Sequence, residues 1–367
     1  VMETRRAGGM DVKTVLLDSV ASQANRMEEA LLAAWEREEL AFPVIGVDFT
    51  GDAALVDLGK VTSLQAPHRI ADAILRDAMG PDGKLFRDMP EGKAYTDASP
   101  RNATAVYRYC PTALLLGVWD STGPKGGLGA KFARALTSEI VGLGAQEGLK
   151  VGSRLDPLAI QANVPIYHRE DNPSDWTIDE AEAKKDRDRP MLFNRKGGDG
   201  KGKPSAVNHS NIAPTIDEYA GGVTFDHAEQ VVVLSLPALR RLKFVTGYDG
   251  KALAKRADAE RAAHTALAAL GLAAIVHQRS QGYDLRSRCL LVPDSELVLQ
   301  VVLASGATED VSLAGSAANG LLQQAAEAAS KLGLSWEREP VKLTPAAKLV
   351  ALVKKSRHEA AAGGAAD

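Results

Sequence analysis

The chain has 367 residues, of which 45% are hydrophobic and 25% are charged, and its formal net charge is −3. This balance is typical of a soluble globular protein with a sizeable core, and it disfavours a general-purpose nucleic-acid binder, which is usually basic. The two cysteines supply neither a disulfide framework nor a metal cluster, so we expect no metal and no cofactor. No apolar stretch has membrane-spanning length and no signal peptide is evident, so we expect a cytoplasmic protein without a membrane partner.

The first hundred residues predict helices and strands in alternation. Apolar residues at three-to-four spacing predict an amphipathic helix over 14–35, with Leu16 in its buried stripe. Glycine turns predict a strand pair within 41–62, and Pro67 predicts the start of a helix that ends at Met79. Residues 81–104 are rich in Gly, Pro and Asp, which favours loops.

The centre of the chain predicts a phosphate site. Residues 112–120 are typical of a buried strand, 121–129 of a glycine-rich loop and 130–142 of a helix. That helix would carry Lys131 and Arg134 in its first turn, where the helix dipole disfavours cations. The pattern therefore indicates an anion between them, because free amides and close-approach glycines are the components of a phosphate site.

From Asp156 to Pro214 the periodicity fades, which predicts an inserted segment that is mobile or depends on a partner. Its run 184–203 holds eight Lys or Arg and three Asp, a basic arm on an otherwise acidic protein. Further elements are predicted at 222–236 (strand), 237–243 (helix), 252–277 (helix), 286–292 and 296–304 (strands), 316–333 (helix) and from Thr344 (helix). Antiparallel pairs within 41–62 and 286–304 favour an α+β fold.

The glycine-rich loop does not match the common nucleotide motifs. A P-loop fails because Ala130 precedes Lys131 and Phe132 replaces the Ser or Thr, and a dinucleotide fingerprint lacks its third glycine. A looser likeness to small-molecule kinase loops remains over Pro124, Gly127, Leu128 and Gly129, without the acid and serine that such loops need. A tight strand-to-helix turn with solvated lysines is the alternative interpretation.

Other polar residues have two interpretations each. Gln23, Asn25 and Arg26 form either a solvated helix face or a binding face. His68 is typical of a cap or surface residue, whereas Arg69 repeats the unfavourable placement of a cation at a helix start.

Two further groups also leave alternatives open. Arg286 and Arg288 would share one face of a strand, as part of a phosphate-tracking groove or of an ion-pair ladder. Residues 208–211 (Asn-His-Ser-Asn) can contact a base edge or cap themselves in an Asx turn.

The sequence offers little for catalysis. Asp120, beside a serine and a threonine, is the best candidate for a nuclease carboxylate, and Asp156 is a possible helix cap. No triad or metal set is evident, so we expect a protein that is not an enzyme.

Several runs of unusual composition occur in order along the chain: SVASQANRMEEAL (19–31), TSLQAPHRIADAILRDA (62–78), TALLLGVWDSTG with GGLGAKFARALTSEIVG (112–142), SRLDPL (153–158), KPSAVNHSNIAP (203–214), LSLPALRRLKF (234–244) and GYDLRSRCLLVP (282–293). Taken together, these runs resemble the CRISPR-associated backbone subunit of type I-G (formerly I-U) effector complexes, a member of the RAMP superfamily. The resemblance extends in order from about residue 14 to residue 300.

The resemblance implies a modified RRM, ferredoxin-like core with insertions that form a hand-like subunit with a thumb. It divides the chain into the first part of the core with finger insertions (14–155), the thumb (156–215), the rest of the core with C-terminal helices (216–357) and a disordered tail (358–367). The aromatic stacking residues of an ordinary RRM sheet are not evident, and aromatic residues make up only 5% of the chain.

The resemblance also implies a function. Copies would stack head-to-tail along the crRNA in an antiviral ribonucleoprotein (Cascade), contact other type I-G subunits and present the guide for pairing with target DNA. The RNA-binding residues would be Gln23, Asn25, Arg26, His68, Arg69, Lys125, Gly127, Lys131, Arg134, Arg154, Asn208, His209, Asn211, Arg286 and Arg288. A nucleotide-dependent small-molecule kinase using the loop 123–131 is the alternative.

Overall fold

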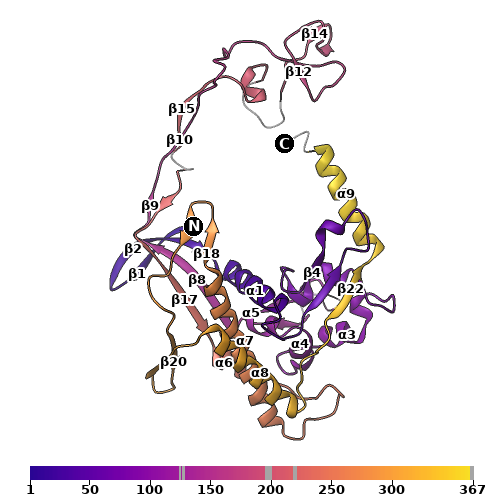
Figure 1. The fold of residues 1–367 in the computed structure, drawn as a ribbon, viewed down its shortest axis with the longest axis vertical. Helices are drawn as coiled ribbons and strands as arrows, with labels where there is room; N and C mark the ends of the chain where they lie inside the picture. Colours follow the sequence, from indigo (N-terminus) through magenta and orange to yellow (C-terminus); the bar gives the residue numbers. More distant parts are fainter. Residues whose placement is uncertain (124, 126–128, 195–200, 218–220, 364–367) are drawn as a thin grey trace. The chain divides into compact units, whose positions relative to one another are not determined.

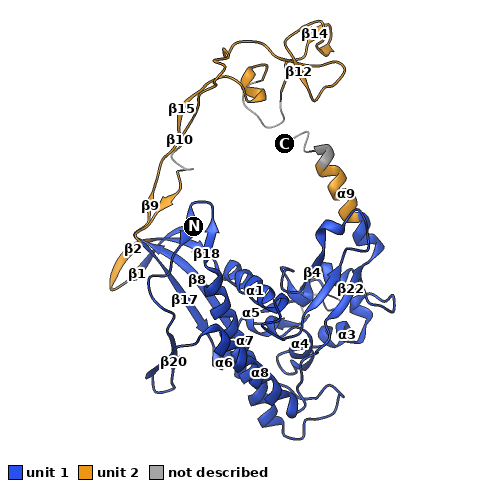
Figure 2. Ribbon diagram, in the orientation of Figure 1, with its two compact units in different colours: residues 1–5, 14–143, 227–351 blue, residues 6–13, 144–226, 352–367 orange. Residues whose placement is uncertain are grey.

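A computed structural model describes residues 1–123, 125, 129–194, 201–217 and 221–363 (Figure 1). The chain combines helices and strands in an α+β fold, as expected. It divides into two compact units (Figure 2). Unit 1 comprises Val1–Arg5, Thr14–Leu143 and His227–Ala351, and unit 2 comprises Arg6–Lys13, Gly144–Asp226 and Leu352–Asp367.

The larger sheet of unit 1 has the strand order β1-β2-β8-β17. These strands are β1 (Met2–Ala7), β2 (Met10–Asp18), β8 (Leu136–Leu143) and β17 (His227–Leu234). Strand β8 is antiparallel to both β2 and β17, so it lies in the middle of the pairing. Its side chains alternate between a face that carries Ser138 and Ile140 and a face that carries Glu139.

Helix α1 (Val20–Glu36) packs against β8, and it begins later than the apolar spacing predicts. Residues 14–18 belong to strand β2 instead, so the expectation of a helix from Thr14 is wrong at its start. The side chain of Ser19 accepts a hydrogen bond from the amide of Ser22 and ends the strand by capping the helix. Ala24, Met27 and Leu31 are buried, as the spacing predicts.

Helix α7 (Arg256–Gln281) forms the core of unit 1 together with α8 (Gly315–Lys331) and α1. By length and composition α7 would qualify as a membrane span, contrary to the expectation that no apolar stretch has this length. In the structure, however, 61% of its apolar window is buried. Small side chains such as Ala263 and Ala266 are fully buried, and they permit close helix packing.

The stretch 112–142 differs most from expectation. Helix α5 (Thr112–Leu116) replaces the first strand, and the glycine-rich loop joins two short strands, β6 (Val118–Trp119) and β7 (Lys131–Phe132). The expected helix over 130–142 is strand β7 followed by strand β8. Although Ala, Leu, Lys and Arg favour a helix, the burial of β8 has a period of two: Leu136, Ser138 and Ile140 are buried on the face of the sheet that α1 covers.

The second sheet of unit 1 has the order β4-β3-β22-β5, with β3 (Ile45–Asp48), β4 (Lys60–Thr62), β5 (Ala78–Met79) and β22 (Val341–Pro345). The predicted strand pair within 41–62 is confirmed as β3 and β4. Strand β22 pairs in parallel with β3 and joins the C-terminal region to the sheet.

Short helices fill the connections of unit 1. They are η1 (Val56–Leu58), η2 (Arg69–Ala71), α2 (Ala73–Arg76), η3 (Phe86–Asp88), α3 (Pro90–Thr96), α4 (Thr104–Tyr109) and α6 (Leu236–Arg240). The single helix expected over 67–79 is thus broken, and 81–104 contains helices. Helix α9 (Ala347–Gly363) continues through 358–363, where a disordered tail was expected.

Two hairpins follow α7, and they pair differently from the expectation. They are β18 (Tyr283–Arg286) with β19 (Cys289–Leu291), and β20 (Leu299–Val302) with β21 (Thr308–Val311). The predicted pairing of 286–292 with 296–304 is therefore wrong.

Unit 2 consists of two-stranded ribbons. These are β9 (Gln146–Glu147) with β16 (Val223–Thr224), β10 (Lys150–Arg154) with β15 (Ile212–Asp217), β11 (Tyr167–His168) with β12 (Trp176–Thr177), and β13 (Lys185–Asp186) with β14 (Arg189–Pro190). A small core of Ile166, Phe193 and Ala206 lies beside the turn η5 (Pro204–Val207). The segment 156–214 thus contains short strands and a small core despite its weak periodicity.

Candidate nucleic-acid interface

The hairpin of β6 and β7 presents an aromatic ring and a cation side by side. Trp119 pairs with Lys131, and Val118 pairs with Phe132. Because neighbouring residues in a strand point to opposite faces, the second pair is buried whereas the first is turned outward. Trp119 is 50% exposed, and the Lys131 ammonium lies 4.6 Å from its ring centroid, within the range of a cation–π contact.

The stem of Arg134 packs against Gly117, two residues before Trp119, because glycine leaves room for it. A Cβ on Gly117 would stand 2.9 Å from Cγ of Arg134, and the φ of Gly117 is +82°, which favours glycine. The side chain of Arg134 is exposed. Over the described ranges, neither Arg134 nor Lys131 forms an ion pair with a carboxylate.

Arg69 has a different role from the one its sequence position suggests. It is 6% exposed, and its Nε and Nη2 atoms donate to the two carboxylate oxygens of Glu28 at 2.6 and 2.7 Å. Its Nη1 donates to the carbonyl of Gly117 at 2.9 Å. Arg69 lies in the turn η2 with φ +51°, not in the first turn of a helix. The expectation of a cation facing a groove is therefore wrong for Arg69, which is instead paired with Glu28 in the interior.

Glu28, the partner of Arg69, is 1% exposed. Burial raises the pKa of its carboxyl to about 7, and the charges of Arg69 and Arg134 act in the opposite direction. This carboxyl therefore links the buried ion pair electrostatically to the exposed guanidinium of Arg134.

Two ion pairs tie the glycine-rich loop to the unit, one at its middle and one directly before it. Lys125 forms an ion pair with Asp97 at 2.6 Å, and Arg87 forms one with Asp120 at 3.1 Å. Asp120 is 2% exposed, so its carboxylate neutralises an arginine and is not presented to a substrate. Gly127 lies outside the described residues.

The loop leads into strand β7, so the kinase interpretation loses the helix N-terminus on which a phosphate would rest. His68 is exposed, and its backbone amide donates to the carboxylate of Asp72. In the part of the chain that the structure describes, no group of three or more His, Cys, Asp or Glu side chains could hold a metal ion.

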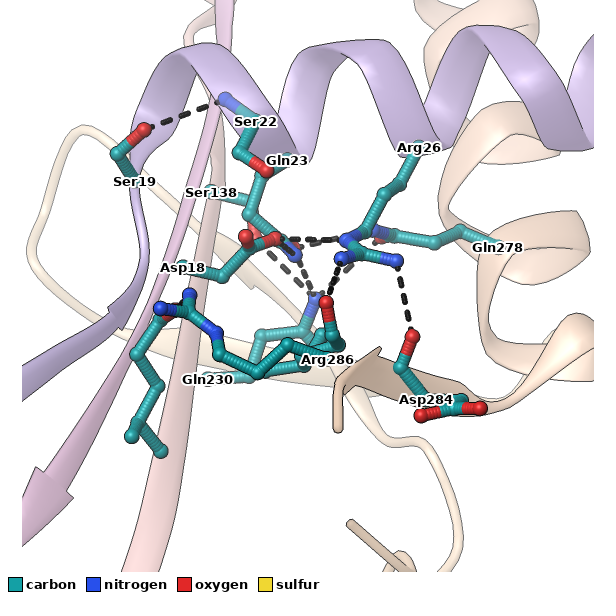
Figure 3. Close-up of polar contacts among 12 residues, drawn as sticks. Asp18, Ser19, Ser22, Gln23, Arg26, Ser138, Gln230, Gln278, Asp284 and Arg286 are labelled. Atoms are coloured by element: carbon teal, nitrogen blue, oxygen red, sulfur yellow. Dashed lines mark hydrogen bonds and ion pairs between the residues drawn. The ribbon is translucent and has the colours of Figure 1, made fainter. Parts of the chain in front are cut away.

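Gln23 lies at the centre of a buried polar network between the sheet and the helices (Figure 3). Its Oε1 accepts hydrogen bonds from Ser138 at 2.8 Å, Gln230 at 2.9 Å and Gln278 at 3.0 Å. Its Nε2 donates to the carboxylate of Asp18. Gln23 is fully buried, so neither a solvated face nor an RNA-binding face describes it.

Two arginines extend this network to the hairpin of β18 and β19. Arg26 donates to Asp18 at 3.0 Å and to the carbonyl of Leu285 at 2.8 Å, and Arg286 donates to the carbonyl of Leu17. These contacts hold the hairpin against the β2–α1 junction. Asn25, on the opposite side of the helix, is exposed.

Arg288 is exposed and lies in the hairpin turn with φ +65°. The expectation that it shares one strand face with Arg286 is wrong, because the chain reverses between the two residues.

The predicted residues of unit 2 come together at one turn. Arg154 donates to the carbonyl of His209 at 2.7 Å and to that of Ser210 at 2.8 Å. The amide of Asp156 donates to the side-chain oxygen of Asn211 at 2.7 Å, and the Asp156 carboxylate accepts from the Ser210 amide. Asn208 is exposed in the left-handed region, with φ +61°. The arrangement is a capped turn that directs Arg154 inward, and Asp156 is its cap.

Comparison with known proteins gives one match. Residues 1–147 match the family model of CRISPR-associated protein GSU0053. The match supports a CRISPR-associated protein with a role in an effector complex. The matched part contains α1, the Arg69–Glu28 pair and the hairpin of Trp119 and Lys131. No curated protein matches the chain.

The exposed ring of Trp119 was missed in the sequence. It stands in an apolar run, where an aromatic residue is ordinarily assigned to the core. The sequence did carry an indication that the ring is exposed. Trp119 and Asp120 are neighbours at the end of the run, and neighbouring side chains of a strand point to opposite faces, so one of these two side chains must point outward.

Proposed function

We propose that this protein is a guide-RNA-binding backbone subunit of a type I-G CRISPR surveillance complex. Copies would line the crRNA head-to-tail, a heterologous contact that builds a filament, and would present the guide to target DNA. The observation that carries the proposal is the exposure of Lys131 and Arg134, two cations that pair with no carboxylate among the described residues, within the segment that matches a CRISPR-associated family.

The order of elements in unit 1 supports a RAMP-type core. Strand β2, helix α1, strands β8 and β17 and helix α7 occur in the chain order β-α-β-β-α, with other elements inserted between them, and a ferredoxin-like core begins in this order. Both helices lie on the same face of the sheet, since Gln23 and Gln278 meet Ser138 and Gln230 there. The segment Gly144–Asp226 of unit 2 interrupts the chain between β8 and β17, and within it residues 156–215 would be the thumb.

A backbone subunit must accept any guide sequence, so it should contact phosphate and ribose and leave the base edges free. Exposed Lys and Arg side chains provide such contacts. We propose a scaffold without catalytic activity, because the best candidate carboxylate, Asp120, is buried against Arg87. We also propose that it is located in the cytoplasm.

The test measures how binding of a single-stranded RNA depends on salt. A contact with one phosphate contributes about 0.7 to the slope of log K against log salt for a single strand. Lys131→Ala and Arg134→Ala should each lower the slope by about that amount, whereas Arg37→Ala, which removes an exposed cation paired with Glu39, should leave it unchanged. Wild-type protein that binds no RNA, alone or in its complex, would refute the proposal.

A further inference from the structure

We infer that Trp119 and Lys131 form a stacking platform for one unpaired nucleobase of the bound single strand. The inference rests on the proposed function and adds a mode of contact that phosphate binding alone does not require. It concerns Trp119 and Lys131, which lie opposite each other on the hairpin of β6 and β7, and Arg134, which is exposed two residues beyond β7.

The first step is the unusual exposure of the ring. Trp119 is 50% exposed although the residues around it in the sequence, from Thr112 to Val118, are buried. A large aromatic surface left in water forgoes the stabilisation that burial gives. The strand holds it there, because Val118 and Phe132 fill the inner face of the hairpin and the register puts Trp119 opposite Lys131 on the outer face.

The second step is orientation. The Lys131 ammonium lies 4.6 Å from the ring centroid, so the ring is oriented by a cation–π contact before any ligand arrives. A preoriented ring loses little freedom when a base stacks on it. Every base has a π-face, so stacking is compatible with a subunit that must accept any sequence.

The third step is charge. Lys131 lies opposite Trp119 on the outer face of the hairpin and is exposed, so a nucleotide stacked on Trp119 brings its phosphate close to a cation. Arg134, two residues beyond β7, is a second exposed cation, and its stem packs against Gly117. The platform differs from Trp35, whose ring lies farther from its cation, with Lys60 Nζ at 5.8 Å.

The experiment compares two probes of equal length and charge, a twelve-nucleotide oligouridine and the same backbone without bases. Wild-type protein should bind the oligouridine more tightly by roughly 5- to 150-fold for each stacked base. Trp119→Ala should lose that preference in part and keep the wild-type salt slope, whereas Trp119→Phe should retain most of it. Lys131→Ala should change the slope.

Fluorescence gives a second readout, which guards against a misfolded alanine variant. Binding of the oligouridine should quench tryptophan emission in wild type and in Trp35→Phe, and the quenching should disappear in Trp119→Phe while binding persists. Trp35 is a matched control, since it also lies in unit 1 and its ring also faces a lysine, with Lys60 Nζ at 5.8 Å.

The outcomes separate the two proposals. If wild type binds RNA with the expected salt dependence but Trp119→Ala binds both probes as wild type does, the stacking inference is wrong and the scaffold function stands. If Trp119→Ala loses self-association at unchanged RNA affinity, the ring contacts a second copy and the inference is also wrong. If wild type binds neither probe, the proposed function itself fails.

Discussion

Replacing Arg69 by Met should destabilise unit 1 without changing RNA contacts. The substitution leaves the Glu28 carboxylate, which is 1% exposed, without the two hydrogen bonds that it now accepts at 2.6 and 2.7 Å. Breaking one side of a buried ion pair costs about 3–5 kcal/mol, because the remaining charge stays desolvated. The Gly117 carbonyl also loses its donor.

The double variant Glu28→Met with Arg69→Met should be more stable than Arg69→Met alone, since it buries no unpaired charge. Guanidinium denaturation of wild type, Glu28→Met, Arg69→Met and the double variant gives the coupling free energy of the pair. Arg37→Met is the control, because Arg37 is exposed and its variant should unfold at the wild-type midpoint. The salt slope of RNA binding should be the same for all of them.

The loss should depend on pH in a defined direction. Burial already raises the pKa of Glu28 from 4.5 to about 7, and removing Arg69 takes away an effect that lowers it. The folded state then binds a proton that the unfolded state has released, so stability falls as the pH rises from about 4.5 through the folded pKa. Arg69→Met should therefore be less destabilised at pH 5 than at pH 8. An equal loss at both pH values, or a wild-type stability combined with a lower salt slope, would refute this reasoning.

Three further substitutions test other parts of the structure. Gln23→Leu removes the acceptor of two buried donors, Ser138 and Gln278, so the free energy of unfolding should fall by about 1–3 kcal/mol or more. Asn25→Ala should leave it unchanged, and chemical denaturation measures both. Gly117→Ala should destabilise unit 1 by about 1 kcal/mol or more and displace Arg134, because φ is +82° and the new Cβ would meet the arginine stem; a lower thermal midpoint and a lower RNA salt slope are the expected readouts. Arg154→Ala should open the turn at 208–211, which limited proteolysis would detect as faster cleavage there with unit 1 intact.

The sequence predicted elements well where packing followed a strong period. The strands β3 and β4 and the helix α8 correspond to their expected positions, because turn glycines and apolar spacing indicated them. The prediction of a helix over 130–142 is wrong for a physical reason. The Ala, Leu, Lys and Arg residues of this stretch favour helix, yet between β2 and β17 each alternate residue gains burial, and tertiary pairing outweighs intrinsic propensity.

The candidate site was predicted in part, and the error concerns which cations have partners. Lys131 and Arg134 were chosen for a helix start that does not exist, although their side chains are exposed. Arg69 was chosen for the same reason, and it is buried. A sequence does not show which carboxylate an arginine meets in space, and Glu28 lies 41 residues away. Trp119 was missed because composition alone does not reveal the side of a strand on which a ring lies.

This distinction explains how a chain with a net charge of −3 can serve a polyanion. Many of its arginines are neutralised internally, as Arg26 is by Asp18, Arg69 by Glu28 and Arg87 by Asp120. The net charge includes both partners of each such pair, whereas a polyanionic ligand contacts the exposed cations that have no carboxylate partner. Near the hairpin of β6 and β7, Lys131 and Arg134 are such cations among the described residues. The number of phosphates held by one copy should therefore be small, and the double variant Lys131→Ala with Arg134→Ala should lower the salt slope by about 1.4 for each copy bound. A reduction several times larger would mean that both side chains organise a wider surface, and no reduction would place the bound strand elsewhere on the subunit.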